Sequence, residues 1–240
     1  MQKEIYFIRH GESEYNEWRR RSFLNCTCLC VCDPFIYDAP LSKKGHTQVE
    51  ELRKTIQQKD GVATKVQLVV TSPLSRAIET CLGSFFPAEN LKNNSITTSY
   101  GHRPIVCPLI RERLDKSGDI GISTSELKEK YGERLDYVDM EQQEYPEIWW
   151  YDADGVPEGG EKAIRRESIQ ETKVRVQKFY AWLSRRPEKC IAVVGHSAYI
   201  KMLTSMSRKL NNCEIKRYEI DGEALNVNDI PIATDVADDK

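Results

Sequence analysis

The sequence predicts an α/β fold with three layers (α/β/α), in which a mostly parallel sheet carries helices on both faces. Two observations predict it. Short apolar runs rich in β-branched residues alternate with longer segments whose apolar residues recur at helical spacing. The chain of 240 residues is also long enough for one α/β domain with a sizeable core.

Five apolar runs are expected to form strands, at residues 4–8, 66–70, 105–110, 190–194 and 215–220. The first run, Glu4-Ile5-Tyr6-Phe7-Ile8, has the apolar, β-rich character that a buried parallel strand needs. Pro108 lacks the N–H group that a central strand would use, so the third run is expected at an edge of the sheet.

Two serines mark the starts of predicted helices. Ser42 is a candidate N-cap for a helix over residues 43–58. Ser123 opens a capping box with Glu126, which predicts a short helix that ends near Tyr131.

Three more helices are expected along the chain. Ser72 is expected to cap the helix after the second strand, with Pro73 at its first position and Arg76 in its first turn. One long amphipathic helix is predicted over residues 161–185, and another over about 198–210. The candidate core positions of the long helix are Ile164, Ile169, Val174, Val176, Phe179 and Trp182.

Polar residues stand where the first four predicted strands end: Arg9-His10, Ser72 to Arg76, Arg111-Glu112 and His196-Ser197. Because ligands bind at the carboxyl ends of strands in open α/β sheets, we expect these side chains to lie together. Neighbouring helix N-termini add backbone N–H donors for an anion. Alone, His10 is typical of a core histidine; with Arg76, Glu112 and His196 it indicates a site.

Each residue type suits phosphoryl transfer. Arg9 and Arg76 can hold phosphoryl oxygens through planar forks, and a neutral His10 can attack the phosphorus. His196 can donate to a phosphoryl oxygen, most usefully as imidazolium. Glu112 can protonate the leaving oxygen and then accept a proton from water, although a surface ion pair with its arginine neighbours would look the same. The scheme needs neither a metal nor a cofactor.

Four motifs, in this order along the chain, resemble the motif set of the histidine phosphatase superfamily: Arg9-His10-Gly11-Glu12-Ser13, Ser72-Pro73-Leu74-Ser75-Arg76-Ala77, Arg111-Glu112 and Gly195-His196-Ser197. Ser197 after the second histidine is similar to the phosphoglycerate-mutase-like branch, since acid phosphatases and phytases have aspartate there. Residues 38–45, 48–52 and 167–182 resemble a plant and fungal mutase-like subgroup.

The resemblance implies a phosphohistidine at His10 and Glu112 as the proton donor. It also implies a phosphate pocket made by Arg9, Arg76 and His196. Asn16 falls where the family often has a phosphate-contacting asparagine, and Ser197 is expected in the same substrate-binding set.

Two departures from the family pattern favour hydrolysis over mutase activity. The chain lacks the asparagine-glutamate-arginine and tyrosine-glycine segment of cofactor-dependent mutases. The plant and fungal subgroup also usually has a basic pair just after its aspartate downstream of the glutamate, and the segment Gly118-Asp119-Ile120-Gly121 of this chain lacks that charge. The expected function is therefore a metal-independent phosphatase that hydrolyses a phosphomonoester, on a phosphorylated small molecule or a phosphoprotein. A phosphoglycerate-type mutase and a catalytically weak phospho-ligand-binding scaffold are the alternatives.

Residues 1–228 are expected to form a single domain, with residues 113–160 as an excursion over the active site and residues 229–240 as an acidic mobile tail. Trp149 and Trp150 are expected to pack rather than to stack on a substrate. Arg19-Arg20-Arg21 either attracts a multiply charged substrate or forms a solvated basic face.

A formal net charge of −2 gives no electrostatic reason to expect binding to nucleic acid. The sequence has no apolar run of the roughly 18 residues that a membrane span requires. The charged start Met1-Gln2-Lys3-Glu4 argues against a signal peptide, so a cytoplasmic location is expected. The oligomeric state is left open.

The eight cysteines are expected as free thiols. Cys81, Cys107 and Cys190 lie in apolar contexts that indicate the core. The cluster from Cys26 to Cys32 has four cysteines at alternate positions, a spacing that does not easily wrap a tetrahedral ion. A zinc or copper(I) site, lipidation, redox sensing and a simple irregular insertion all stay open for it.

Overall fold

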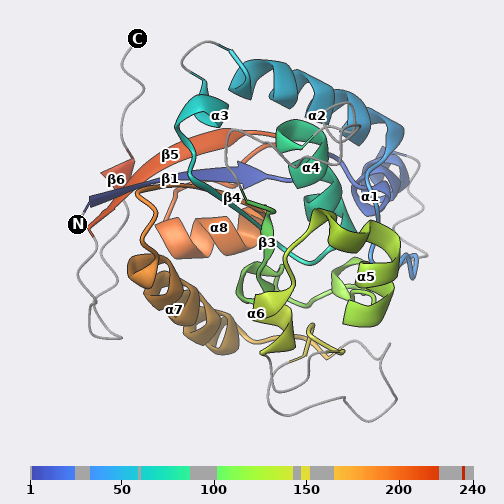
Figure 1. Ribbon diagram of the computed structural model, residues 1–240. Helices are drawn as coiled ribbons and strands as arrows, with labels where there is room; N and C mark the ends of the chain where they lie inside the picture. Colours follow the sequence, from blue (N-terminus) through green and yellow to red (C-terminus); the bar gives the residue numbers. More distant parts are fainter. Residues whose placement is uncertain are drawn as a thin grey trace.

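A computed structural model describes residues 2–24, 33–58, 61–86, 102–142, 147–151, 165–221 and 234–235. Its sheet has the strand order β3-β2-β4-β1-β5-β6 (Figure 1). The strands are β1 (Gln2–Arg9), β2 (Leu68–Thr71), β3 (Ile105–Val106), β4 (Cys190–Gly195), β5 (Ile215–Asp221) and β6 (Thr234–Asp235). Strands β3, β2, β4 and β1 are parallel, whereas β5 and β6 are antiparallel additions. The predicted mostly parallel sheet is confirmed.

The sheet is covered on both faces because its strands send successive side chains to opposite sides. Tyr6 and Ile8 of β1 belong to one apolar cluster, while Ile5 and Phe7 belong to another. On the first face lie α2 (Lys43–Ile56), α4 (Ser75–Phe85), α5 (Thr124–Tyr131) and α6 (Val138–Glu141). On the second lie α7 (Ile169–Arg185) and α8 (Ser197–Thr204) (Figure 1). The three-layer α/β/α prediction is therefore confirmed.

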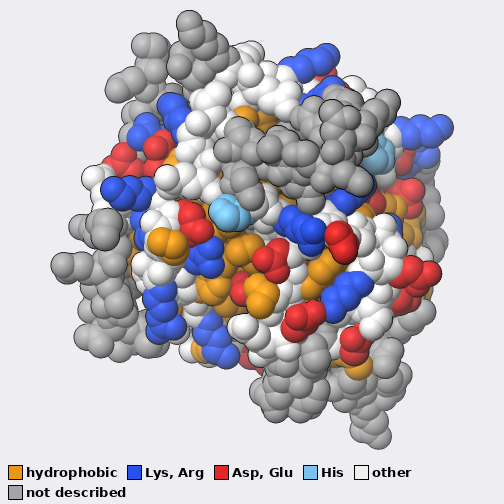
Figure 2. Space-filling view, viewed as in Figure 1, with side chains coloured by type: hydrophobic (Ala, Val, Ile, Leu, Met, Phe, Trp, Pro, Cys, Tyr) orange, Lys and Arg blue, Asp and Glu red, His pale blue; other side chains and the backbone are white. Residues whose placement is uncertain are grey.

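Two further α-helices lie in the first third of the chain. Helix α1 (Glu14–Leu24) follows the first strand, and α3 (Val62–Lys65) precedes β2. On the face shown in Figure 2, basic and acidic side chains are interspersed, as a net charge of −2 would lead one to expect.

Helix starts were predicted well where the capping residue is local. The Ser42 side chain accepts from the backbone N–H of Gly45 at the start of α2. Ser123 and Glu126 form the predicted capping box of α5. Gly45 itself lies against the loop after β1, since a Cβ there would come within 2.1 Å of the Glu12 carbonyl oxygen. The start of α2 is thereby fixed next to the end of β1.

The predicted cap of α4 is wrong. The helix begins at Ser75 with Leu74 at the N-cap position, so Ser72 and Pro73 lie before it. The Asp38 carboxylate, from a distant segment, accepts from both the backbone N–H and the hydroxyl of Ser75 and satisfies the first turn instead. Arg76 nevertheless lies in the first turn, as expected.

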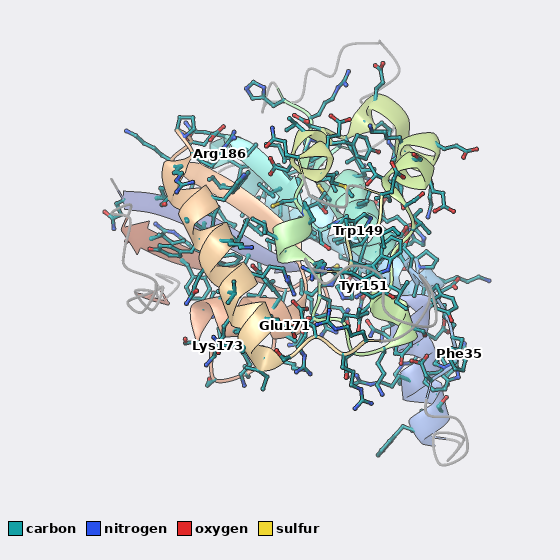
Figure 3. The ribbon with its side chains drawn as sticks, turned by 90° about the horizontal axis from the view of Figure 1, so that it is seen from below. Phe35, Trp149, Tyr151, Glu171, Lys173 and Arg186 are labelled. Carbon is teal, nitrogen blue, oxygen red and sulfur yellow. The ribbon has the colours of Figure 1, made fainter. Side chains whose placement is uncertain are left out.

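The long predicted helix starts later than expected. Helix α7 begins at Ile169, with Ser168 and Glu171 in a capping box. Val176 and Phe179 are buried and Trp182 is partly buried, but Ile169 and Val174 are exposed, so those two core predictions are wrong. Ile164 lies outside the described residues. Figure 3 labels Glu171 and Lys173 in the N-terminal part of α7, where Lys173 is exposed and Glu171 is half-buried.

Two other elements are shorter than predicted. Strand β3 covers Ile105–Val106 at the edge of the sheet, and Pro108–Ile110 form a 3-10 turn. Helix α8 ends at Thr204 because Ser205 adopts a left-handed conformation with φ of 54°. The edge position of β3 is confirmed, whereas the predicted extension of α8 to residue 210 is wrong.

The aromatic residues of the excursion pack into the protein. Trp149, Trp150 and Tyr151 are buried in the cluster that covers the first face of the sheet (Figure 3). A Cβ on Gly121 would come within 2.0 Å of the Trp149 ring, so glycine is needed at this contact. Packing, rather than stacking on a substrate, is confirmed for both tryptophans.

Cys81, Cys107 and Cys190 are buried, as predicted. The cluster from Cys26 to Cys32 lies outside the described residues, as does the tail from 229 to 240 apart from the two residues of β6. Within the described ranges, the structure has no helix long and apolar enough to cross a membrane.

Candidate active site

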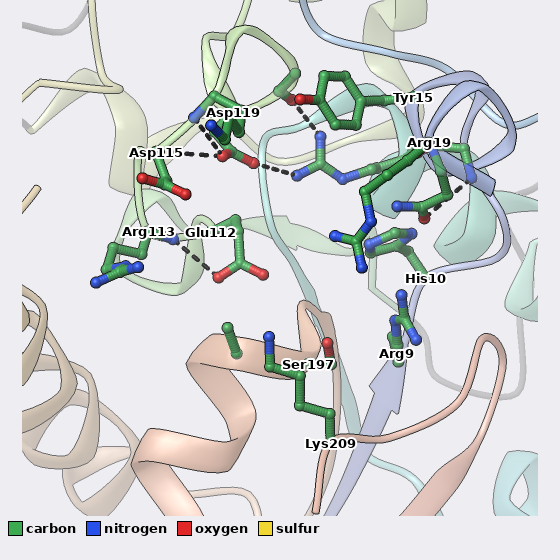
Figure 4. Close-up of a pocket in the computed structure, with 16 residues that line it drawn as sticks. Arg9, His10, Tyr15, Arg19, Glu112, Arg113, Asp115, Asp119, Ser197 and Lys209 are labelled. Carbon is green, nitrogen blue, oxygen red and sulfur yellow. Dashed lines mark hydrogen bonds and ion pairs between the residues drawn. The ribbon is translucent and has the colours of Figure 1, made fainter. Parts of the chain in front are cut away.

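A pocket of about 280 Å³ lies at the carboxyl ends of β1 and β4 (Figure 4). We call it the histidine pocket, because His10 lines it. Its basic lining residues are Arg9, Arg19, Arg76, Arg113, Lys116 and Lys209, and its acidic ones are Glu112, Asp115 and Asp119. Cationic side chains outnumber carboxylates in a chain whose net charge is −2, so the pocket suits an anion.

His10 follows the last residue of β1 and is buried. Its backbone N–H donates to the carbonyl of Gly195 at the end of β4, which fixes its position at the strand ends. The ring Nδ1 lies 2.6 Å from the carbonyl oxygen of Gly11. Since a carbonyl can only accept, Nδ1 carries the proton and Nε2 carries the lone pair.

The charge state of His10 agrees with this tautomer. Burial, together with the guanidinium groups of Arg76 and Arg9, holds the pKa of His10 well below its ordinary value. The imidazole is therefore neutral near pH 7. A neutral imidazole with a free lone pair on Nε2 is a competent nucleophile.

The two arginines predicted for the site, Arg9 and Arg76, differ in how their donors are used. Arg9 donates from Nη1 to the Leu210 carbonyl at 2.8 Å, and its buried Nε has no partner among the described residues. Arg76 donates from Nη1 to the Gly118 carbonyl and from Nη2 to Asp119 Oδ1 at 3.0 Å. Arg9 therefore has an N–H group that is available to an anion, whereas both terminal nitrogens of Arg76 already donate to groups of the protein.

His196 directly follows β4, is the N-cap residue of α8 and has no exposed surface. Its ring centre lies 5.1 Å from that of His10. Nε2 contacts the Ser72 hydroxyl at 2.8 Å, and Nδ1 is buried without a partner among the described residues. His196 is therefore brought beside His10, as expected.

The imidazolium form, in which His196 would donate most usefully, is not favoured by the surroundings of this ring. Burial and the nearby Arg76 hold the pKa of His196 well below its ordinary value, so the ring is neutral near pH 7. A neutral imidazole can still donate one N–H to a phosphoryl oxygen.

Glu112 lines the pocket on the side opposite His10 (Figure 4). Its Oε1 accepts from the backbone N–H of Arg113 at 2.9 Å. Burial lowers the pKa of Arg9 while the Glu112 carboxylate opposes that shift, so the two groups interact across the pocket. Glu112 is thus in the right cavity for proton transfer.

The segment that carries Glu112 is held by buried charges that we call the paired cluster: Arg111, Glu167 and Arg175. Arg175 contacts Glu167 through Nε at 2.9 Å and through Nη2 at 2.7 Å. It also donates to the carbonyls of Leu109 and Arg111. Arg111 lies 3.5 Å from Glu167. This cluster fixes the backbone on the N-terminal side of Glu112.

Asn16 and Ser197 also line the histidine pocket. Asn16 belongs to α1, and its Oδ1 accepts weakly from the Ser13 N–H at 3.4 Å. Ser197 is the first residue of α8 and is buried. All seven predicted site residues are therefore in or beside one cavity.

Sequence reasoning missed several lining residues, among them Asp119 and Lys209. The arginine run was a partial signal, and the structure separates its members. Arg19 lines the pocket, whereas Arg20 contacts Glu12 at 3.4 Å and Arg21 pairs with Glu17. Within the described ranges, no group of His, Cys, Asp and Glu side chains is arranged to hold a metal ion.

The model of the histidine phosphatase superfamily (branch 1) matches residues 5–84 and 118–231 of this chain. Phosphoglycerate mutase-like protein 1 from Arabidopsis thaliana is 27% identical over 245 residues, which cover 93% of this chain and 78% of that protein. A second Arabidopsis thaliana phosphoglycerate mutase-like protein is 25% identical over 244 residues, covering 89% of this chain and 83% of its own length.

Among solved structures, the ecdysone phosphate phosphatase of Bombix mori in complex with tungstate aligns with a TM-score of 0.55 at 15% identity. The alignment covers 90% of this chain and 88% of that one. A mycobacterial glucosyl-3-phosphoglycerate phosphatase aligns with a TM-score of 0.50 at 18% identity, covering 90% and 92%. These likenesses show the α/β fold.

Proposed function

Because the chain belongs to branch 1 of the histidine phosphatase superfamily, we propose that it is a phosphomonoesterase that works through a phosphohistidine at His10. One observation carries the proposal: a buried His10, whose Nδ1 donates to the Gly11 carbonyl and so leaves the lone pair on Nε2, lines the same pocket as Arg9 and Arg76 and is kept neutral by burial and by these two guanidinium groups. An inert structural histidine needs no such surroundings. Two structural neighbours are named as phosphatases, which supports hydrolysis of a phosphoester as the reaction.

In the first step the Nε2 lone pair of His10 attacks phosphorus and the bond to the ester oxygen breaks. Glu112, protonated at this stage, gives its proton to that oxygen, and an alcohol leaves. Arg9, Arg76 and His196 hold the non-bridging oxygens, where charge must be stabilised. Catalysis is then mainly positioning and electrostatic stabilisation.

In the second step water attacks the phosphohistidine. Glu112, now a carboxylate, takes a proton from the water as its oxygen bonds to phosphorus. The bond from phosphorus to Nε2 breaks, and the lone pair returns to His10. Inorganic phosphate leaves, and the two steps balance with neither a metal nor a cofactor.

The substrate that fits best is a phosphorylated small molecule or the phosphorylated side chain of a protein. A pocket of about 280 Å³ admits a phosphoryl group with a small organic remainder. Asn16 and Ser197 are positioned to contact that ligand from α1 and α8. Arg19 and Lys209 are exposed, so they meet the part of the substrate that extends from the cavity.

A mutase is the second candidate, because the curated relatives carry mutase-like names. A mutase would return the phosphoryl group of His10 to the organic product instead of to water. Release of free phosphate, as against an isomerised phosphoester, separates these two reactions.

The deciding experiment is to trap a labelled phosphoenzyme with a panel of ³²P-labelled metabolites and phosphopeptides. Wild type is expected to take up an acid-labile, alkali-stable label, as a phosphohistidine does. His10→Asn is expected to take up none, while the control His46→Asn, an exposed histidine, labels normally. If wild type binds phosphoesters but never takes up the label, the phosphohistidine enzyme is ruled out and the phospho-ligand-binding scaffold becomes the better explanation.

A further inference from the structure

Asp119 lies in the segment that lacks the basic pair of the plant and fungal subgroup, and its carboxylate contacts an arginine of the proposed phosphate site. Its Oδ1 lies 3.0 Å from Nη2 of Arg76. The carbonyl of the preceding residue, Gly118, accepts from Nη1 of the same guanidinium. One short segment therefore engages both terminal nitrogens of Arg76.

The carboxylate is held in this place by its own turn. Asp119 ends the 3-10 turn Ser117–Asp119, and its Oδ2 accepts from the backbone N–H groups of Asp115 at 3.3 Å and Lys116 at 3.1 Å. Asp33 accepts from the Ser117 N–H at 2.8 Å and anchors the start of the turn. The contact with Arg76 is thus built into the local backbone.

Tyr15 of α1 closes the other side of the turn. A Cβ on Gly118 would come within 2.8 Å of the Tyr15 ring, so the backbone and this ring are in close contact. The side chains of Arg76 and Asp119 are only 6% and 14% exposed. Water therefore screens this ion pair weakly.

The groups that face Asp119 come from three segments: Arg76 of α4, Tyr15 of α1, and Glu112 with the turn's own Asp115 and Lys116. Burial and the neighbouring Glu112 carboxylate raise the pKa of Asp119 to about 6, while Arg76 and the two backbone N–H groups oppose that shift. At neutral pH the side chain is mainly ionised. A phosphoryl dianion on Arg76 would then stand next to a carboxylate that uses the same guanidinium.

We propose that Asp119 competes with the phosphate group for Arg76, so that phosphate binding requires the carboxylate to release the guanidinium. The proposal rests on the proposed function, in that Arg76 is a phosphate ligand there. Two consequences follow. Asp119 weakens the hold of the site on inorganic phosphate, which favours product release, and binding of a tetrahedral dianion is accompanied by proton uptake at this carboxylate.

The test measures binding of inorganic sulfate by titration calorimetry, because sulfate is a tetrahedral dianion whose charge is constant from about pH 5 to about pH 8. At about pH 7.5, Asp119→Asn is expected to bind sulfate about 10-fold more tightly than wild type, because one like charge has been removed. Wild-type affinity should rise as the pH falls through about 6, since the competing carboxylate is then neutralised. This rise should be smaller in Asp119→Asn.

The matched control is Asp115→Asn. It removes the same charge from the same pocket, but Asp115 pairs with Arg166 at 3.3 Å rather than with Arg76. Its effect on sulfate affinity should be several-fold smaller. Equal or weaker sulfate binding by Asp119→Asn would overturn the proposal and make Asp119 a residue that positions Arg76.

A measurement on wild type alone guards against a variant that does not fold. Sulfate titrations at about pH 7 in buffers of different ionisation enthalpy report proton uptake, and a wild type that takes up no proton on binding sulfate would also overturn the competition. Binding of sulfate needs no turnover. A protein that never takes up the label can therefore still bind sulfate more tightly after Asp119→Asn, and an active enzyme can show no such change. The two proposals can thus be rejected independently of each other.

Discussion

Two adjacent residues of this fold, Arg111 and Glu112, belong to two groups of charged side chains that differ in how completely they are paired. Arg111 belongs to the paired cluster, in which Glu167 and two carbonyls engage Arg175 on every nitrogen. Glu112 belongs to the histidine pocket, where Arg9 Nε and His196 Nδ1 have no partner within the described part of the chain.

The difference separates scaffold from site. Buried polar groups that satisfy one another hold the backbone in place, and removing one member leaves a buried charge without compensation. Buried polar groups without partners cost free energy in the empty protein, and a ligand can satisfy them. The paired cluster therefore predicts losses of stability on mutation, and the histidine pocket predicts losses of activity.

The largest expected effect is on the nucleophile. His10→Asn should lower kcat at least about 10⁴-fold, since removing a covalent nucleophile costs most of the rate enhancement. The free energy of unfolding near pH 7 should stay within about 1 kcal/mol of wild type, because the lost group is not part of a paired network. Hydrolysis of p-nitrophenyl phosphate and urea denaturation measure the two quantities. A large loss of stability with little loss of rate would show that His10 belongs to the scaffold rather than to the site.

The next effect concerns the scaffold. Glu167→Gln should lower the free energy of unfolding by about 3–5 kcal/mol, because Arg111 and Arg175 would stay buried without a carboxylate. Glu50→Gln is the matched control: its exposed pair with Arg53 should contribute less than about 1 kcal/mol. Both are measured by urea denaturation. Similar small losses for the two variants would show that burial and pairing at Glu167 contribute little.

Glu112 tests the boundary between the clusters. Glu112→Gln should slow turnover of alkyl phosphates by about 10²–10⁴-fold, because their poor leaving groups need a proton. Activated aryl phosphates, which need little protonation, should lose much less, and Glu129→Gln on the exposed face of α5 should change neither. Equal loss on both substrates would make Glu112 a structural residue fixed by its neighbour Arg111.

The sequence was sufficient for features determined by nearby residues. The apolar runs located β1, β2 and β4, and serines such as Ser42 located helix starts, because strand burial and capping are local in sequence. The site residues could be grouped because parallel strand ends share one edge of a sheet.

The wrong predictions depend on contacts between distant segments. Ser72 looked like a cap, but its hydroxyl contacts His196, 124 positions along the chain, and Asp38 caps α4 in its place. Asp119 was noted only as a missing positive charge, since the sequence does not show that its carboxylate lies on Arg76. Tertiary partners of this kind have no periodicity or spacing from which to predict them.

The smallest expected effect is the dependence of stability on pH, and it follows from the two buried, neutral histidines. The folded-state pKa values of His10 and His196 lie well below 6.5, whereas an unfolded histidine titrates near 6.5. As the pH falls below about 6.5, the unfolded state binds protons that the folded state does not. Each histidine therefore lowers the free energy of unfolding by up to about 1.4 kcal/mol per pH unit.

Two buried carboxyl groups act in the opposite direction. Burial raises the pKa values of Asp38 and Asp119 to about 6, so between about pH 6 and pH 4 the folded state binds protons that the unfolded state does not. Wild-type stability should therefore change little over that window, which hides the histidine contribution. His10→Asn exposes it: relative to wild type, the variant should gain about 1.4 kcal/mol per pH unit below about pH 6.5 in urea denaturation. The control is His46→Asn on the surface, which should show no such gain in stability. An equal gain in this control would mean that the loss of wild-type stability at low pH does not come from keeping a buried imidazole neutral in the histidine pocket.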